Sequence, residues 1–230
     1  MPRRATEKKN PKIYALSRYN IAMRFKDRTE AGRMLAKALA KYEHEDVVVF
    51  ALPRGGVILG NEVANYLHAP LDLLITRKIG YPGNEECAVC AVAEEGDMIC
   101  DSNASRLDQE WLRAQAEKEK QEAKRRRQVY LAGRGSTPVE NKVAIIVDDG
   151  VATGLTILLA IMVLKNRHPK KIVVAVPVSS QDAAERIRAE ADELVALDVP
   201  QYFMAVGEHY EQFPQLSDED VIRYMNQQRT

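Results

Sequence analysis

Five short runs of aliphatic residues recur along the chain and predict β-strands. One of about five residues lies within "DVVVFALPRGG" at 46–56, and the others are "LDLLIT" at 71–76, "KVAIIV" at 142–147, "KIVVAVPV" at 171–178 and "ELVAL" at 193–197. All five are nearly continuous in apolar residues, which is typical of parallel strands that are buried on both faces. The pattern therefore predicts a parallel sheet covered on both sides.

Segments with helical periodicity alternate with these runs. Residues 28–43 carry apolar side chains at spacings of three and four, a helix is expected to open near Val57, and residues 104–131 form a helix dense in charge. Strands that alternate with helices, joined by right-handed crossovers, give a doubly wound α/β fold. Its ligand site is expected at the carboxyl ends of the strands.

Two segments break this alternation. Residues 1–22 are basic, contain proline and show no pattern, so we expect a loose N-terminal arm ahead of a single domain at 23–230. Residues 77–103 are interrupted by glycine and proline and hold only a short alternating stretch. They predict a long excursion that can carry a hairpin, and loops of that length are usually functional or mobile.

Composition narrows the classes of partner. Lys plus Arg and Asp plus Glu both total 33, so the formal net charge is zero and no global field favours nucleic acid. The "KRRR" stretch within the charged helix is interpreted as a solvated face with cations near the helix C-terminus, and a nucleic-acid patch is the less favoured alternative. No apolar run approaches the roughly 20 residues that span a bilayer.

The three cysteines carry no strong signal. With no secretory segment at the start of the chain, they suggest reduced thiols and a cytoplasmic location. Cys87 and Cys90 form a C-x-x-C, with Cys100 nearby, but no second pair or suitably spaced histidine completes a set of four zinc ligands. Metal or redox use of these thiols is therefore the minor alternative.

The stretch "VAIIVDDGVATGLT", residues 143–156, contains the strongest candidates for ligand binding. Gly150 and Gly154 let the backbone turn sharply, while Val151, Ala152, Thr153, Leu155 and Thr156 offer amide N–H groups that lead into a helix N-terminus. Such an assembly binds a phosphate dianion. It lacks the lysine of the nucleoside triphosphatase P-loop.

Two adjacent carboxylates precede this phosphate loop. Asp148 and Asp149 would repel the same phosphate, so they suit neutral hydroxyl groups or a hydrated cation. A phosphate next to a polyol indicates a ribose 5-phosphate. A strand that merely ends in an acidic turn and a helix cap is the less favoured interpretation of this ordered combination.

"IIVDDGVATGLT" resembles the phosphoribosyl diphosphate (PRPP) signature of type I phosphoribosyltransferases. With "LPRGGV", "RKIGYPGN", "AVAEEG" and "FMAVGEHYEQF", the resemblance covers about residues 24–225 and is strongest to a stand-alone microbial subfamily of undefined acceptor. It implies a five-stranded parallel sheet with a small hood, in which Asp148 and Asp149 hold the ribose hydroxyls and residues 152–156 hold the 5-phosphate. It also implies Mg²⁺-dependent transfer to an acceptor with release of pyrophosphate, as in nucleotide metabolism.

The resemblance assigns further residues to the pyrophosphate. Residues 52–56 resemble the family's pyrophosphate loop, in which Arg54 offers a cationic fork and Gly55 and Gly56 expose backbone amides. Arg77 and Lys78 end the second predicted strand and can reach the same diphosphate. An ordinary turn and ordinary surface cations are the alternatives. Residues 79–103 occupy the place of the family's flexible loop, which closes over the reacting centre.

The acceptor is less defined. Family members that use 6-oxopurines usually carry an aspartate where this chain has Ala152, which disfavours hypoxanthine, guanine and xanthine. The expected hood, residues 198–215, supplies Tyr202, Phe203, Tyr210 and Phe213 as candidate stacking faces, with core packing as the alternative for each.

The expected partners are PRPP and a small acceptor. The Mg²⁺ would be held largely through PRPP, so no metal-binding residue is named, and a homo-oligomer is left open. A PRPP-binding regulator or catalytically inactive homologue is the alternative function, which turnover would exclude.

Overall fold

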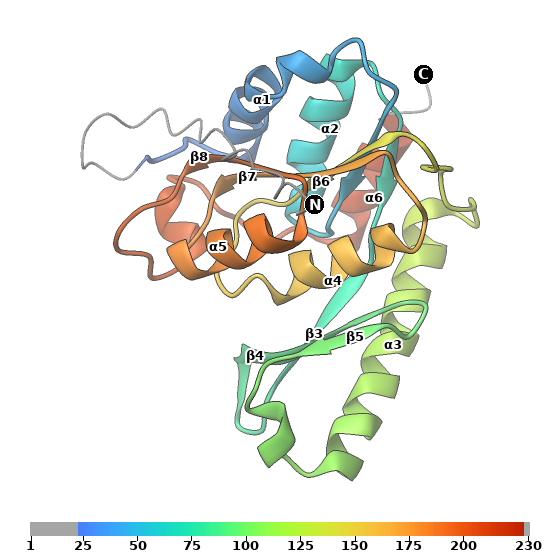
Figure 1. The fold of residues 1–230 in the computed structure, drawn as a ribbon, viewed down its shortest axis with the longest axis vertical. Helices are drawn as coiled ribbons and strands as arrows, with labels where there is room; N and C mark the ends of the chain where they lie inside the picture. The colour runs from blue at the N-terminus through green and yellow to red at the C-terminus, as the bar shows by residue number, and fades with distance from the viewer. Residues whose placement is uncertain (1–22, 228–230) are drawn as a thin grey trace, which may run out of the picture.

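The five predicted strands form one parallel sheet. The computed structural model describes residues 23–227, so the predicted arm at 1–22 lies outside the described residues. The sheet has the order β2-β1-β6-β7-β8, and all neighbours are parallel. The doubly wound α/β prediction is confirmed (Figure 1). The strands are β1 (Val47–Ala51), β2 (Leu71–Leu73), β6 (Val143–Val147), β7 (Lys171–Val178) and β8 (Glu193–Asp198).

Two hydrophobic layers cover the sheet because successive strand side chains point to opposite faces. In β1, Val47 and Val49 join the layer under α1, α2 and α6, whereas Val48 and Phe50 join the layer under α4 and α5. These helices are α1 (Arg28–Ala38), α2 (Gly56–Leu67), α4 (Leu155–Lys165), α5 (Gln181–Glu190) and α6 (Asp218–Gln227). The helix expected over 28–43 ends early, and a short 3-10 turn, η1 (Ala40–Tyr42), follows it.

The strand predicted at 71–76 is two strands in two sheets. Its first half is β2, and Thr76 begins β3 (Thr76–Tyr81), which pairs with β4 (Asn84–Ala93) and through it with β5 (Met98–Cys100) in an antiparallel sheet. The run is continuously apolar because Leu74 and Ile75, between the two strands, are buried in the two layers of the main core. In the sequence, residues that are buried without hydrogen-bonding to a neighbouring strand look the same as residues of a strand.

The segment expected as a flexible loop, 79–103, therefore contains antiparallel strands. A hairpin was expected there, and β3, β4 and β5 form two successive hairpins. Whether the segment moves over a ligand stays a prediction. A 3-10 turn, η2 (Ala104–Arg106), leads to the charged helix α3 (Gln109–Leu131). The helix begins at Gln109 rather than at 104 because Asp108 caps it: the Asp108 carboxylate accepts from the backbone N–H of Glu110 and Trp111.

Residues 76–131, here called the small lobe, pack on the main sheet through α4. That helix is apolar on nearly all sides because the parallel sheet covers one face, while Ala88, Ala91 and Ala93 of β4 share a hydrophobic cluster with it. Figure 1 shows α4 between the main sheet and the strands of the small lobe. The small lobe also has a core of its own, around Ile79, Val89 and Leu112.

A disulfide corrects the expectation of reduced thiols. Cys90 of β4 and Cys100 of β5 are directly opposite one another, with Cα atoms 4.0 Å apart, and they form a disulfide. The antiparallel register brings them together, and the C-x-x-C spacing of Cys87 and Cys90 gave no sign of it. Among the helices of residues 23–227, none has both the length and the apolar character needed to cross a bilayer.

Candidate active site

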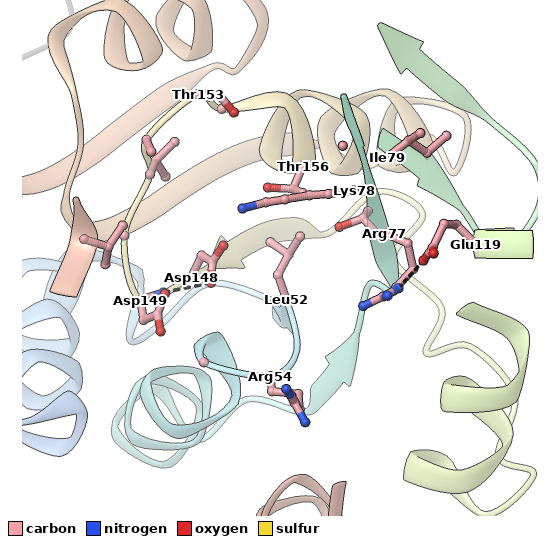
Figure 2. A pocket seen from close by; sticks show the side chains of 18 of the residues that line it. Leu52, Arg54, Arg77, Lys78, Ile79, Glu119, Asp148, Asp149, Thr153 and Thr156 are labelled. Atoms are coloured by element: carbon pink, nitrogen blue, oxygen red, sulfur yellow. Dashed lines mark hydrogen bonds and ion pairs between the residues drawn. The ribbon is translucent and has the colours of Figure 1, made fainter. Parts of the chain in front are cut away.

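A cleft opens where the strand order of the main sheet reverses. β1 and β6 are neighbours, but the chain leaves them in opposite directions along the sheet, so the loops that follow them diverge. The loop after β1 is residues 52–55 and the loop after β6 is residues 148–154. Both line a cleft of about 1080 Å³, whose other wall is formed by β3 and α3 of the small lobe (Figure 2).

The carboxylate pair lies at the base of this cleft. Asp149 is held from a distant part of the chain, because Arg28 Nε donates to Asp149 Oδ2 at 2.8 Å and Tyr210 Oη donates to the Asp149 carbonyl oxygen at 2.6 Å. Arg28 is itself fixed, since its Nη1 donates to the Pro214 carbonyl at 2.7 Å. Asp148 accepts the backbone N–H of Asp149 at 2.9 Å and has no ion-pair partner within residues 23–227. The two adjacent acids are thus inequivalent.

Burial raises the pKa of both carboxyls. For Asp148, desolvation and the neighbouring Asp149 charge raise the pKa well above its usual range, and the Asp149 N–H, Lys78 and Arg28 oppose this. For Asp149, desolvation raises the pKa, while the charge and the hydrogen bond of Arg28 lower it. A cation or a set of hydroxyl donors in the cleft would favour the ionised pair.

The loop after Asp149 forms an anion cradle. Gly154 has φ +80°, which favours glycine, and it precedes α4 without a side-chain cap, so the first amides of that helix are available to a ligand. The carbonyls on the outside of the loop are occupied: Ser180 Oγ donates to Ala152 O at 2.6 Å and Arg186 donates to Thr153 O. Ala152, Thr153 and Thr156 line the cleft, whereas the Leu155 side chain is buried in the core and only its amide can serve.

Close packing requires glycine in the loop after β6 and where the loop after β1 leads into α2. A Cβ on Gly55 would lie 1.8 Å from Asp149 Oδ2, and one on Gly56 would lie 2.6 Å from the Val147 carbonyl oxygen. A Cβ on Gly150 would lie 2.5 Å from a Val206 methyl. The loop after β1 therefore packs directly against the acid pair, a constraint that the sequence did not reveal.

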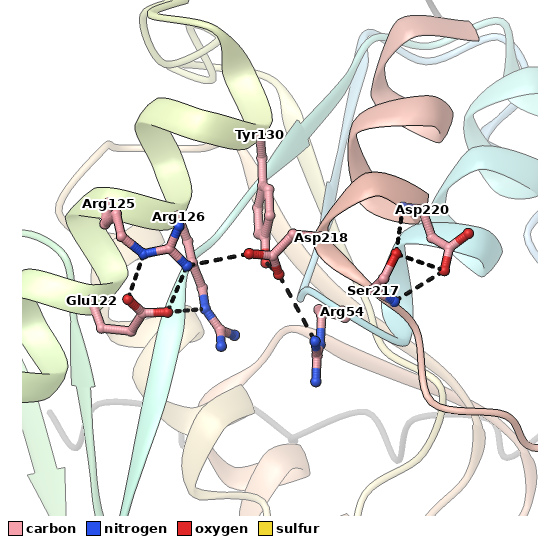
Figure 3. Close-up of polar contacts among 8 residues, drawn as sticks. All are labelled: Arg54, Glu122, Arg125, Arg126, Tyr130, Ser217, Asp218 and Asp220. Carbon is pink, nitrogen blue, oxygen red and sulfur yellow. Dashed lines mark hydrogen bonds and ion pairs between the residues drawn. The ribbon is translucent and has the colours of Figure 1, made fainter.

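Arg54 lies at the edge of the cleft with its hydrogen-bonding groups available. Its Nη1 lies 3.8 Å from Asp218 Oδ1, its side chain is 37% exposed, and its guanidinium makes no hydrogen bond within residues 23–227. Asp218, the first residue of α6, also accepts Tyr130 Oη at 2.6 Å and Arg125 Nη2 at 3.2 Å from α3 (Figure 3). The Tyr130 hydrogen bond, together with Arg125 and Arg126, lowers the pKa of Asp218.

Arg77 and Lys78 differ in their surroundings. Arg77 Nε donates to Glu119 Oε2 of α3 at 2.8 Å, so this predicted ligand of the diphosphate is already in an ion pair. Lys78 is exposed, lines the cleft and has no ion pair within residues 23–227. Figure 2 shows its side chain extending between Thr156 and Asp148.

Of the four aromatic residues proposed for the acceptor, the cleft contains one. Phe213 lines it, but Tyr202 is 84% exposed outside it and Phe203 stacks on His209, with centroids 5.4 Å apart. Tyr210 is buried behind Asp149. The 198–215 segment therefore supports the acid pair more than it presents rings to a ligand.

Sequence reasoning missed several residues that line the cleft. Arg28 gave no local signal, because it lies 121 residues from the carboxylate that it contacts. The missed residues of α3 are Trp111, Gln115, Lys118 and Glu119. Their spacings of four, three and one place them on one face of the helix. The sequence shows that such a face exists, but it does not show which part of the protein the face lies against. Within the described residues, no group of three or more His, Cys, Asp or Glu side chains is arranged to hold a metal ion.

Comparison with known proteins gives the family. The family model described as "Phosphoribosyl transferase domain" matches residues 24–212. Proteins of two Mycobacterium tuberculosis strains, each named "Putative phosphoribosyl transferase", are 40% identical over 205 residues, which is 88% of this chain and 46% of theirs. The crystal structure of TT1426 from Thermus thermophilus has a TM-score of 0.75 and 43% identity, and the match covers 89% of this chain and 99% of that one.

The chain therefore belongs to the phosphoribosyl transferase domain family, as its resemblance to type I phosphoribosyltransferases implied. It spans about half the length of the curated relatives that it matches.

Proposed function

We propose that this protein transfers the 5-phosphoribosyl group of PRPP to a small acceptor and releases pyrophosphate. One observation supports this above all: the phosphate cradle at 152–156 lies next to two inequivalent carboxylates, with Arg54 and Lys78 lining the same cleft. A ribose 5-phosphate extends from a phosphate to a diol and then to C1, and the cleft offers amides, carboxylates and cations to match. Ala152 disfavours a 6-oxopurine as the acceptor.

The transfer step explains why both signs of charge are needed. Positive charge develops at ribose C1 while the C1–O bond breaks and pyrophosphate leaves with the bonding electrons. Arg54 and Lys78 stabilise the charge that grows on the leaving group, as fixed cations in a partly enclosed site do. Asp148 accepts hydrogen bonds from the ribose hydroxyls, and the first amides of α4 orient the 5-phosphate.

The residues present fit a Mg²⁺ ion that is held mainly by the substrate. Asp148 is a carboxylate without an ion-pair partner in the described chain, and Asp149 is already neutralised by Arg28, so the protein offers at most a few oxygen ligands. Such an ion neutralises charge on the diphosphate when bound. A cytoplasmic location and the lack of a nucleic-acid partner remain predictions.

The test has a binding arm and a turnover arm. Calorimetric titration with PRPP and Mg²⁺ should show saturable binding, and a thermal shift should follow, because a ligand of the folded state stabilises it by about 2.7 kcal/mol at 100 times its dissociation constant. Absence of binding at millimolar PRPP would exclude the proposal. Binding without pyrophosphate release across a screen of nucleobases and small acids would identify the alternative, a PRPP-binding regulator or inactive homologue.

A further inference from the structure

Trp111 is an aromatic side chain that lines the cleft and is available to a ligand. Within the described residues, the cleft is also lined by Phe213 and Tyr81. Phe213 is covered by Arg28, whose Cζ lies 3.7 Å from the ring centroid, and by the Tyr210 ring, stacked at 4.8 Å. The Tyr81 hydroxyl donates to Asp101 Oδ2 at 3.0 Å. Trp111 packs partly against the core of the small lobe and makes no ring or cation contact within residues 23–227.

The face of α3 that carries Trp111 also carries two unengaged polar groups. Residues 111, 115, 118 and 119 line the cleft and lie on one side of the helix, as their spacing requires. Glu119 is neutralised by Arg77 at 2.8 Å. Gln115 and Lys118 have no hydrogen bond or ion pair within the described residues. This wall therefore presents an aromatic ring, an amide and an ammonium group.

The charge of the opposite side of the cleft orients any acceptor. Asp148 and Asp149 lie at the base, next to the phosphate cradle, where a second anionic group would be repelled (Figure 2). Among the cations that line the cleft, Lys118 of α3 lies on the wall opposite these acids and has no ion pair in the described chain, so it is the group that suits an acidic substituent on the acceptor. Trp111 and Lys118 are seven residues apart, about 10 Å along the helix axis, which suits a planar ring on Trp111 with its substituent toward Lys118.

We propose that the face of α3 formed by Trp111, Gln115 and Lys118 is the acceptor subsite, and that the acceptor is a planar heteroaromatic carboxylate. The inference rests on the proposed function. The ring stacks on Trp111, the carboxylate pairs with Lys118, and Gln115 hydrogen-bonds the ring edge. A ring nitrogen supplies the electron pair for the bond to ribose C1, the C1–O bond breaks, pyrophosphate leaves with its pair, and any proton on that nitrogen passes to solvent water.

The experiment uses the fact that the chain contains a single tryptophan. Calorimetric titration with PRPP and Mg²⁺ first establishes whether the protein binds PRPP. The protein is then loaded with ribose 5-phosphate, which cannot react. It is titrated with two matched pairs of compounds: nicotinate with nicotinamide, and orotate with uracil. Quenching of Trp111 emission, corrected for absorption by the titrant, reports occupancy next to its ring. At least one carboxylate should quench with a Kd at least about fivefold lower than that of its neutral partner.

Two variants of one helix give the control. Lys118→Ala should abolish the preference for the carboxylate. Lys124→Ala makes the same change of charge on an exposed position of α3 that does not line the cleft, and should keep the preference. Equal affinity for the members of both pairs, a preference that survives in Lys118→Ala, or no quenching by any of the four compounds would overturn the inference. If PRPP itself does not bind, the proposed function fails instead.

Discussion

Arg28 Nε donates to Asp149 Oδ2 at 2.8 Å, and the Arg28 side chain is only 8% exposed. This ion pair joins the first turn of α1 to the loop after β6. Of the two adjacent acids, Asp149 is therefore already neutralised within the protein. Breaking a buried pair on one side typically costs about 3–5 kcal/mol, because the remaining charge is left without compensation.

Arg28→Gln should therefore destabilise the protein, and more so at high pH. Burial already raises the pKa of Asp149 against the opposing effect of Arg28, so loss of the guanidinium raises it further. A carboxyl whose folded pKa exceeds its unfolded value contributes less stability as pH rises through that interval. Urea unfolding should show a loss of about 3 kcal/mol at pH 8 and a smaller loss at pH 5.

The control for this prediction is Arg33→Gln on the same helix. Arg33 pairs with Glu62 at 3.1 Å, but its side chain is largely exposed, so the change should cost less than about 1 kcal/mol. Equal losses in the two variants, or a loss at position 28 that does not depend on pH, would contradict a buried charge on Asp149.

Arg54 and Asp218 give a prediction about the leaving group. Removal of a negative charge near an anion site favours the anion, so Asp218→Asn should raise affinity for pyrophosphate about two- to fivefold and leave ribose 5-phosphate unchanged. Arg54→Ala should weaken pyrophosphate binding by about tenfold, in line with a charge-assisted contact of 1.5–3 kcal/mol. Both constants are measured by calorimetry with Mg²⁺.

Glu219→Gln provides the comparison, because it removes the same charge from the adjacent exposed position of α6 and has no ion pair in the described chain. It should change neither constant. A Glu219 variant that matched Asp218→Asn would show a general effect of charge rather than a contact with Arg54.

Asp148 should discriminate the ribose from the phosphate. Asp148→Asn keeps a hydrogen-bond acceptor but loses its charge, so affinity for PRPP should fall by about tenfold or more, given 1.5–3 kcal/mol for bonds to a charged group. Inorganic phosphate, which has no diol, should bind as well as before or better. Thr153→Ala with Thr156→Ala should instead weaken both ligands alike. An Asn variant that lost phosphate and PRPP equally would show that the acid only supports the loop.

Glu94 makes the stability of the fold dependent on pH. Burial raises the pKa of Glu94 to about 7, although Arg127 Nη1 lies 3.1 Å away and opposes the shift. Because the folded pKa lies above the unfolded value near 4.5, the stabilising contribution is complete below pH 4.5 and is lost as pH rises to 7. After allowance for solvent screening, the loss should be on the order of 1–2 kcal/mol.

Glu94→Gln should remove that loss, so the difference in the free energy of unfolding between pH 5 and pH 8 should shrink. Glu140→Gln removes one exposed carboxylate that does not contribute to the shifted pKa of Glu94, so it should leave that difference unchanged. Urea titrations at the two pH values measure both. A difference between pH 5 and pH 8 that shrank by the same amount in both variants would contradict the assignment to Glu94.

The sequence by itself determined the parallel sheet and the chemistry of one loop. The strands could be predicted because burial on both faces requires continuous apolar residues, and this is visible locally. The acids at 148 and 149 and the phosphate cradle after them are contiguous, so their roles could be proposed from residue type and order alone. The family followed from the same stretch.

Only the tertiary structure decided which groups face these residues. Arg28 and Asp149 are 121 residues apart, and no periodicity links them. The division of 71–76 into two sheets, the pairing of Cys90 with Cys100, and the placement of Trp111 opposite the phosphate loops all depend on how separate elements pack. The sequence encodes such contacts through the packing of the whole chain, whereas its local pattern reports only burial and backbone preference.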